Sequence, residues 1–122
     1  MILADTSVWI DHFRSGNAEF SRLLEEGEVQ IHDFIIGELA SGNLRDRELT
    51  LHRLQRLPAI KTARNSEVLH LLEAHQLHGT GLGWVDLHLL TAARLSNCSL
   101  LTLDRALREA AKRLLRATAS QR

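Results

Sequence analysis

The sequence predicts an α/β fold in which a short parallel sheet of about four strands is flanked by helices on both faces. Two observations carry this prediction. Short apolar runs of strand length alternate with longer segments of helical periodicity, and only one proline and seven glycines interrupt them. The chain has 122 residues, 44% hydrophobic and 25% charged, which is typical of one globular domain. We therefore expect residues 1–122 to form a single domain.

Each element is predicted from its local pattern. Short apolar or alternating runs bounded by turn residues predict strands over 1–4, 28–32, 59–61 and 99–103. Apolar side chains at helical spacing predict helices over 6–15, 17–26, 33–41, 44–57, 66–77, 86–95 and from 105 towards the C-terminus. Thr6 or Ser7 is expected to cap the first helix and Asp33 the third, because short oxygen-bearing side chains accept from free backbone N–H groups there.

Composition excludes several classes of protein. The single cysteine, Cys98, excludes a disulfide scaffold and a cysteine zinc cluster, and it is expected to be a small buried hydrophobe. No apolar stretch approaches the roughly 20 residues that span a bilayer. The first residues, MILADTSVWIDHF, show neither a basic start nor a cleavage site. The expectation is a cytoplasmic protein that does not bind membranes.

Four acidic residues occupy unusual positions. Asp5 and Asp104 each follow an apolar strand directly, whereas Glu38 and Asp86 lie in strongly apolar helical segments. The carboxyl ends of parallel strands meet at one edge of a sheet, where ligands bind. An ionised carboxylate in apolar surroundings is costly unless it is paired or bound to a metal. Helix capping is the alternative role, above all for Asp86, but it does not readily explain four acids at one edge.

The donor atoms of this set indicate its chemistry. Four carboxylates without a cysteine or an obligatory histidine favour a hard cation with oxygen ligands, Mg²⁺ or Mn²⁺ rather than Zn²⁺. A divalent cation in an acidic pocket suits phosphodiester hydrolysis, because it activates water and stabilises charge on the attacked phosphate. The carboxylates alone also fit a phosphatase, and assays on a phosphomonoester and on RNA would separate the two.

Four ordered motifs carry a family resemblance over nearly the full length. They are ILADTSVWID at 2–11, IGEL at 36–39, GWVDLHLL at 83–90 and LTLD at 101–104. With them the chain resembles the PIN domain, and within it the VapC-type toxin ribonucleases of bacterial toxin–antitoxin pairs. The resemblance implies that Asp5, Glu38, Asp86 and Asp104 are the catalytic and metal-binding acids, with Thr102 as an accompanying hydroxyl. Thr6 and Ser7 orient Asp5 or a metal-bound water in one interpretation, and cap the helix in the other.

The resemblance implies a Mg²⁺-dependent endoribonuclease that cleaves structured RNA to arrest translation. A cognate antitoxin would hold it inactive, and it would assemble as a homodimer. Two features depart from the family: helix and tail follow Asp104 where many relatives have another strand, and His88 stands where relatives commonly have a small or apolar residue. The alternatives are a housekeeping PIN nuclease without an antitoxin and a catalytically silent PIN-like interaction module. The presence of all four acids argues against the silent module.

The C-terminal segment predicts a second functional surface. The chain has 15 basic and 15 acidic residues, yet residues 105–122 hold six basic groups and one acid. A basic stripe is expected on one face of the last helix, formed by Arg105, Arg108, Lys112 and Arg116. We hypothesise that it binds RNA phosphates. The alternatives are a solvated helix face and a protein interface.

Two further expectations concern partners. Because guanidinium groups pair with carboxylates, the antitoxin is expected to insert an Arg or Lys among the four acids and to pack an apolar helix in a groove near Trp9 and Phe13. Trp9 and Trp84 flank two of the acids. The favoured interpretation for both tryptophans is packing in the core or an interface, rather than stacking on RNA bases.

Overall fold

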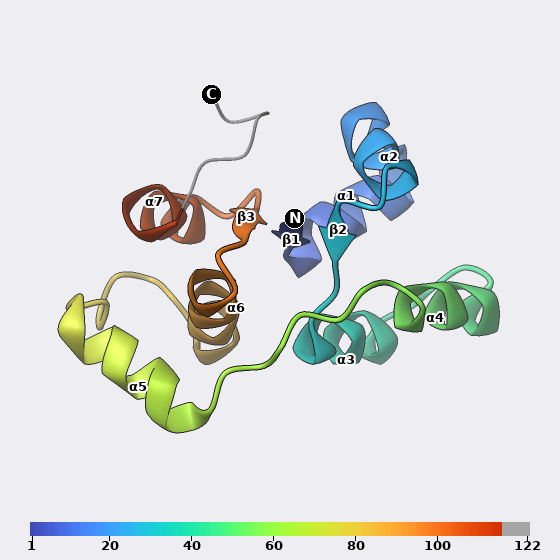
Figure 1. The fold of residues 1–122 in the computed structure, drawn as a ribbon. Coiled ribbons are helices and arrows are strands. Elements are labelled where there is room, and N and C mark those ends of the chain that lie inside the picture. Colours follow the sequence, from blue (N-terminus) through green and yellow to red (C-terminus); the bar gives the residue numbers. More distant parts are fainter. Residues whose placement is uncertain (116–122) are drawn as a thin grey trace.

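Three short parallel strands form the centre of the fold in the computed structural model, which describes residues 1–115 (Figure 1). β1 (Ile2–Ala4) lies between β2 (Val29–Gln30) and β3 (Ser99–Leu101), so the strand order is β2-β1-β3. All strand residues are buried or half-buried, as is usual for parallel strands covered by helices. The prediction of an α/β fold with a short parallel sheet is confirmed.

Helices flank this sheet. They are α1 (Thr6–Ser15), α2 (Ala18–Glu25), α3 (Asp33–Ser41), α4 (Arg47–Gln55), α5 (Asn65–Ala74), α6 (Trp84–Leu95) and α7 (Arg105–Leu114). α1 packs on β1, α6 and α7 pack on β3, and α3 packs on α1. Figure 1 shows α4 and α5 at the periphery, joined by a long connection without helix.

The sheet has three strands in residues 1–115 rather than the four predicted. The segment predicted as a strand at 59–61 contributes an isolated parallel bridge between Ile31 and Ala59. Ile31 donates to the carbonyl of Pro58 at 2.8 Å, and Ile60 donates to the carbonyl of Ile31 at 2.9 Å. Pairing stops there because Pro58 has no N–H to donate and Ala59 is exposed, with nothing to bury on that side.

The ends of several helices differ from the prediction. Asp5, not Thr6 or Ser7, caps α1, and His32, not Asp33, caps α3 through its Nδ1, which accepts from the N–H of Phe34 at 2.9 Å. The helix predicted from residue 44 begins only at Arg47, because Asp46 has a φ of 47° and takes the left-handed conformation.

The interior is built around α6. Its residues 87–93 are all buried, including the polar His88 and Thr91. Trp9 is buried as well, with its ring edge-on to Phe20 at a centroid distance of 4.8 Å. Cys98 is buried, in agreement with the prediction. No helix in the described part of the chain is long and apolar enough to cross a membrane.

The parallel register brings the ends of β1 and β3 together. Ala4 pairs with Leu101, and the N–H of Asp5 donates to the carbonyl of Leu101 at 3.0 Å. Each strand then leads into a helix, β1 into α1 and β3 into α7. The acidic caps of these two helices, Asp5 and Asp104, therefore lie at the same edge of the sheet.

Candidate active site

Asp5 is the buried acid of the candidate site, with 6% of its surface exposed. Its Oδ1 accepts from the Val8 N–H at 3.3 Å and from the Ser7 hydroxyl at 2.5 Å. Its Oδ2 accepts from the Thr102 hydroxyl. These three donors compensate for the burial of a carboxylate, and they hold the side chain in one orientation.

Two hydroxyl groups connect Asp5 to the turn that carries Asp104. The Thr102 hydroxyl donates to Asp5 and accepts from the N–H of Asp104 at 3.0 Å. The Ser7 hydroxyl also donates to Asp5 and accepts from the N–H of Leu103 at 3.0 Å. Each hydroxyl thus uses its proton and a lone pair at once. The separation of Asp5 and Asp104 is fixed by this network rather than left to repulsion between the two carboxylates.

Glu38 and Asp104 are exposed, which corrects the expectation that all four acids lie in apolar surroundings. Glu38 is on α3 and accepts from the Thr6 hydroxyl at 2.7 Å through Oε1. Asp104 caps α7, with Oδ2 accepting from the N–H of Leu107 at 2.9 Å. Only Asp5 and Asp86 bear a burial cost. Glu38 and Asp104 bear no such cost because solvent hydrates their carboxylates.

Asp86 is half-buried in the first turn of α6. Burial raises the pKa of its carboxyl above the ordinary value, while a hydrogen bond from the Gly83 N–H to Oδ2, at 3.0 Å, opposes that shift. The negative charges of the other three candidate acids raise this pKa further. The four carboxylates therefore share one electrostatic environment, although three of them also have the capping contacts that the alternative interpretation predicted.

No protein cation neutralises this cluster within residues 1–115. The ion pairs there join Met1 to Glu28, Arg22 to Glu19 and Glu26, and Arg64 to Glu67. Arg108 is the basic side chain tied to the site, but its guanidinium donates to the carbonyl of Thr102 at 3.1 Å, not to a carboxylate. The site therefore carries an uncompensated negative charge, which attracts cations.

The donor set fits a hard divalent cation, but it is not a closed coordination shell. Within residues 1–115, no three Asp, Glu, His or Cys side chains are grouped closely enough to bind one ion as they stand. Glu38, Asp86 and Asp104 each use one oxygen in a hydrogen bond, and this leaves the second oxygen available. Oxygen donors in an open arrangement match Mg²⁺ or Mn²⁺, which keep several water ligands.

The basic stripe is only partly within the described residues. Arg105, Arg108 and Lys112 are exposed on α7, whereas the buried side chains of this helix are Leu107, Ala110 and Ala111. The fourth predicted member, Arg116, lies outside the described residues. Because Arg108 also touches the Thr102 carbonyl, the stripe begins at the edge of the acidic cluster.

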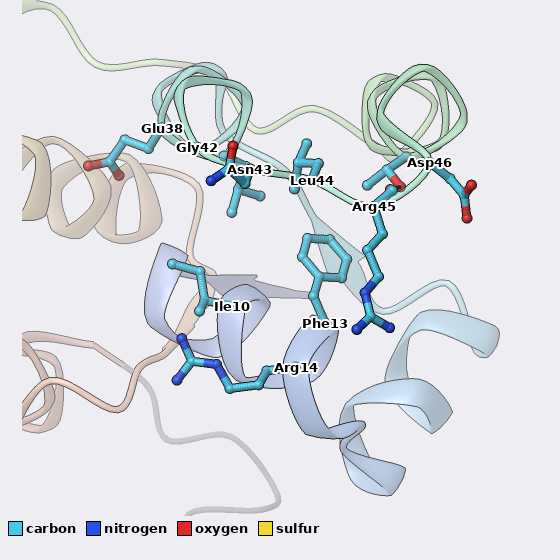
Figure 2. A pocket seen from close by; sticks show the side chains of 11 residues that line it. Ile10, Phe13, Arg14, Glu38, Gly42, Asn43, Leu44, Arg45 and Asp46 are labelled. Carbon is cyan, nitrogen blue, oxygen red and sulfur yellow. Dashed lines mark hydrogen bonds between the residues drawn. The ribbon is translucent and has the colours of Figure 1, made fainter.

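A groove of about 480 Å³ lies between α1 and the segment that joins α3 to α4 (Figure 2). Figure 2 shows Ile10, Phe13 and Arg14 along one wall and Glu38 at one end, so the groove opens beside the acids. Trp9, which we expected beside such a groove, is buried and does not line it. The sequence carried a usable signal, since Ile10 and Phe13 are three residues apart and share a helix face.

Sequence reasoning also missed an aromatic contact beside the acids. His88 is 2% exposed, and burial lowers the pKa of its imidazole. Its ring packs edge-on against Trp84 and Phe34, with centroid distances of 4.8 Å to each. The spacing of Trp84 and His88, four residues apart on one helix, could have indicated half of this cluster. The contact with Phe34 joins α3 to α6 and has no local sequence signal.

Known proteins resemble this chain over most of its length. The family model of the PIN domain matches residues 2–113, which contain all four candidate acids. Ribonuclease VapC32 of Mycobacterium tuberculosis, from strains CDC 1551 / Oshkosh and ATCC 25618 / H37Rv, is 40% identical to this chain over 111 residues. The aligned part covers 90% of the chain and 90% of each of those proteins.

Proposed function

Since the chain belongs to the PIN-domain family, we propose that it is a metal-dependent endoribonuclease and the toxin of a toxin–antitoxin pair. The observation that carries the proposal is the set of four carboxylates from four elements that share one electrostatic environment and have no neutralising cation in residues 1–115. The likeness to a VapC ribonuclease supports RNA as the substrate. We propose that residues 1–122 form one domain, because the family match begins at residue 2 and ends at residue 113.

Nucleases of this family generally use divalent metal ions, and we propose that Asp5, Glu38, Asp86 and Asp104 bind Mg²⁺ here, with Mn²⁺ able to substitute. When bound, the ion would activate water and stabilise charge on the attacked phosphate. Asp5 is the most rigid of the four, because three donors orient it. The pKa of Asp86 is raised, so a bound cation would favour its ionised form.

Three hydroxyl groups support these acids in the proposal. Ser7 and Thr102 fix the orientation of Asp5 and tie it to the Asp104 turn. Thr6 orients Glu38 across the gap between α1 and α3. These are positioning residues, since their contacts reach the acids rather than a substrate. Pre-organisation of this kind lowers the cost of gathering like charges around one ion.

We further propose that the basic stripe binds the phosphate backbone of a structured RNA. Arg105 follows Asp104 directly, and Arg108 and Lys112 continue along the exposed side of α7. A strand of RNA on this face would lead into the acidic cluster. Cleavage of such an RNA would arrest translation, and because RNA is the substrate we expect the protein to act in the cytoplasm.

We propose that the antitoxin binds in the groove shown in Figure 2. Ile10 and Phe13 are exposed large apolar side chains in it, and an apolar helix could cover them. Glu38 at the end of the groove belongs to the acidic cluster, so an Arg or Lys of the same partner could reach the four acids and exclude metal. We also propose a homodimer, which light scattering would test.

The decisive experiment is cleavage of total cellular RNA by the purified protein, with cleaved ends mapped. Cleavage at few positions, lost in excess EDTA and lost in Asp5→Asn or Asp86→Asn variants that remain folded, is expected. Release of phosphate from a phosphomonoester without RNA cleavage would instead identify a phosphatase. Cleavage that persists in excess EDTA would refute the metal requirement. Failure to cleave any RNA would favour the silent interaction module.

A further inference from the structure

Two large aromatic side chains are exposed beside the acidic cluster. Trp84, the first residue of α6, is 42% exposed, and Phe34, in the first turn of α3, is 38% exposed. The buried ring of His88 lies against both, at interplanar angles of 84° to Trp84 and 62° to Phe34. We call Trp84, Phe34 and His88 the aromatic platform.

Both exposed rings of the platform belong to helices that carry candidate acids. In the sequence Trp84 lies between Gly83 and Asp86. The N–H of Gly83 donates to the Asp86 carboxylate. Phe34 precedes Glu38 by four residues on α3, so the two share one face of that helix. The platform therefore borders the acidic cluster along the two helices that supply Glu38 and Asp86.

His88 does more at this place than fill space. Neither of its ring nitrogens has a hydrogen-bond partner among residues 1–115, although the ring is buried. Leaving buried polar atoms unpaired is unfavourable, and an aliphatic side chain would avoid the cost. The flat ring, by contrast, supports two neighbouring rings at its edges, an arrangement that aromatic pairs prefer. The His88 ring thus packs against both exposed rings and orients them.

We propose that the aromatic platform stacks an unpaired base of the RNA substrate beside the phosphodiester to be cut. The inference rests on the proposed nuclease function. RNA is the proposed ligand because the neighbouring acids, with bound metal, would select a phosphodiester. The bases on either side of the cleaved bond must then lie within one nucleotide of the acids. Single-stranded RNA is recognised by stacking of its splayed bases on exposed aromatic rings.

The chain offers a direct optical test, because Trp84 and Trp9 are its only tryptophans and Trp9 is buried. The assay uses the full chain with Asp5→Asn to prevent cleavage. The probes are an RNA hairpin with a single-stranded loop and a blunt RNA duplex of equal length. We expect the hairpin to quench tryptophan fluorescence and the duplex to leave it unchanged. In Trp84→Phe protein the quenching should disappear, because only Trp9 still emits, while hairpin affinity changes little.

Affinity variants test the energetic contribution. Trp84→Leu and Phe34→Leu should each weaken hairpin binding about tenfold, equivalent to about 1.4 kcal/mol, which lies in the range for stacking of one base. Leu95→Ala is the matched control, since Leu95 is also an exposed apolar side chain on α6, at its far end. It should bind the hairpin normally.

The possible failures are distinguishable. If the wild type cleaves RNA but both leucine variants bind the hairpin with unchanged affinity, the platform does not stack a base and the nuclease proposal still stands. If the leucine variants bind RNA normally but lose self-association in light scattering, the platform is an interface between protein chains, and the inference is wrong. If the wild type neither binds nor cleaves any RNA, the inference and the proposed function both fail.

Discussion

Thr102 provides the most demanding test of how the site is held together. Its side chain is buried, and its hydroxyl makes two hydrogen bonds, one to the Asp5 carboxylate and one from the N–H of Asp104. Thr102→Val keeps the shape of the side chain and removes both. A hydrogen bond to a charged group contributes about 1.5–3 kcal/mol, and an ordinary one about 0.5–1.5 kcal/mol. Because the exposed Asp104 turn can be rehydrated, we expect a total loss of about 2–4 kcal/mol.

Urea unfolding in EDTA measures this loss. With a slope of about 2 kcal/mol per molar urea, the midpoint should fall by about 1–2 M while the slope stays constant. Thr102→Ser, which retains the hydroxyl and loses one methyl group, is the matched control. Its urea midpoint should fall by less than that of Thr102→Val. RNA cleavage by the folded Thr102→Val protein should also decline, since Asp5 is less firmly oriented. A midpoint equal to that of the wild type would refute the network as a source of stability.

Four further outcomes are expected. Asp86→Asn should raise the melting temperature in EDTA at pH 7. The pKa of Asp86 is raised in the folded protein, so the folded protein holds this proton more tightly than the unfolded chain. Wild-type stability therefore falls as the pH rises above the ordinary pKa of 3.8, and the stability advantage of the asparagine variant should vanish below that pH. Adding Mg²⁺ or Mn²⁺ should raise the wild-type melting temperature in scanning calorimetry and restore cleavage, whereas Asp86→Asn should respond weakly. Arg108→Gln with Lys112→Gln should raise KM and flatten the salt dependence of RNA binding by about two units of slope, with Arg53→Gln and Arg56→Gln as the control pair. Phe13→Asp should abolish antitoxin binding in calorimetric titration and leave cleavage intact, and an unchanged affinity would remove the groove from the antitoxin site.

The positions of Asp5 and Asp104 could be predicted because they depend on chain direction. In a parallel sheet every strand ends at the same edge, so an acid directly after an apolar strand lies there whatever the side-chain packing. Asp5 and Asp104 are placed in this way, and the register of β1 with β3 agrees. The sequence pattern could not distinguish an acid that caps a helix from an acid that binds a metal. The structure gives both Asp5 and Asp104 the geometry of a helix cap as well.

The features that were missed depend on contacts between distant segments. The segment at Ala59 forms only a single bridge because Pro58 precedes it and Ala59 is exposed, although the segment is apolar enough to predict a strand. Trp9 and Trp84 occupy similar positions in the sequence beside acids, yet one is buried against Phe20 and the other is exposed against His88. Which tryptophan is buried depends on the element that covers it, and a single sequence contains no local pattern for that.

The hydrogen bond between Thr102 and Asp5 joins residues 97 positions apart, and β1 pairs with a strand that begins only at Ser99. On a ribosome Asp5 is therefore made long before Thr102, and the two cannot pair until the later segment has been synthesised. Until then a growing chain holds Asp5 without the strand and hydroxyl that orient it. Closing so long a loop is also entropically costly and slow compared with forming local helices. The order of synthesis therefore keeps the site unassembled on a growing chain until β3 and Thr102 have been made.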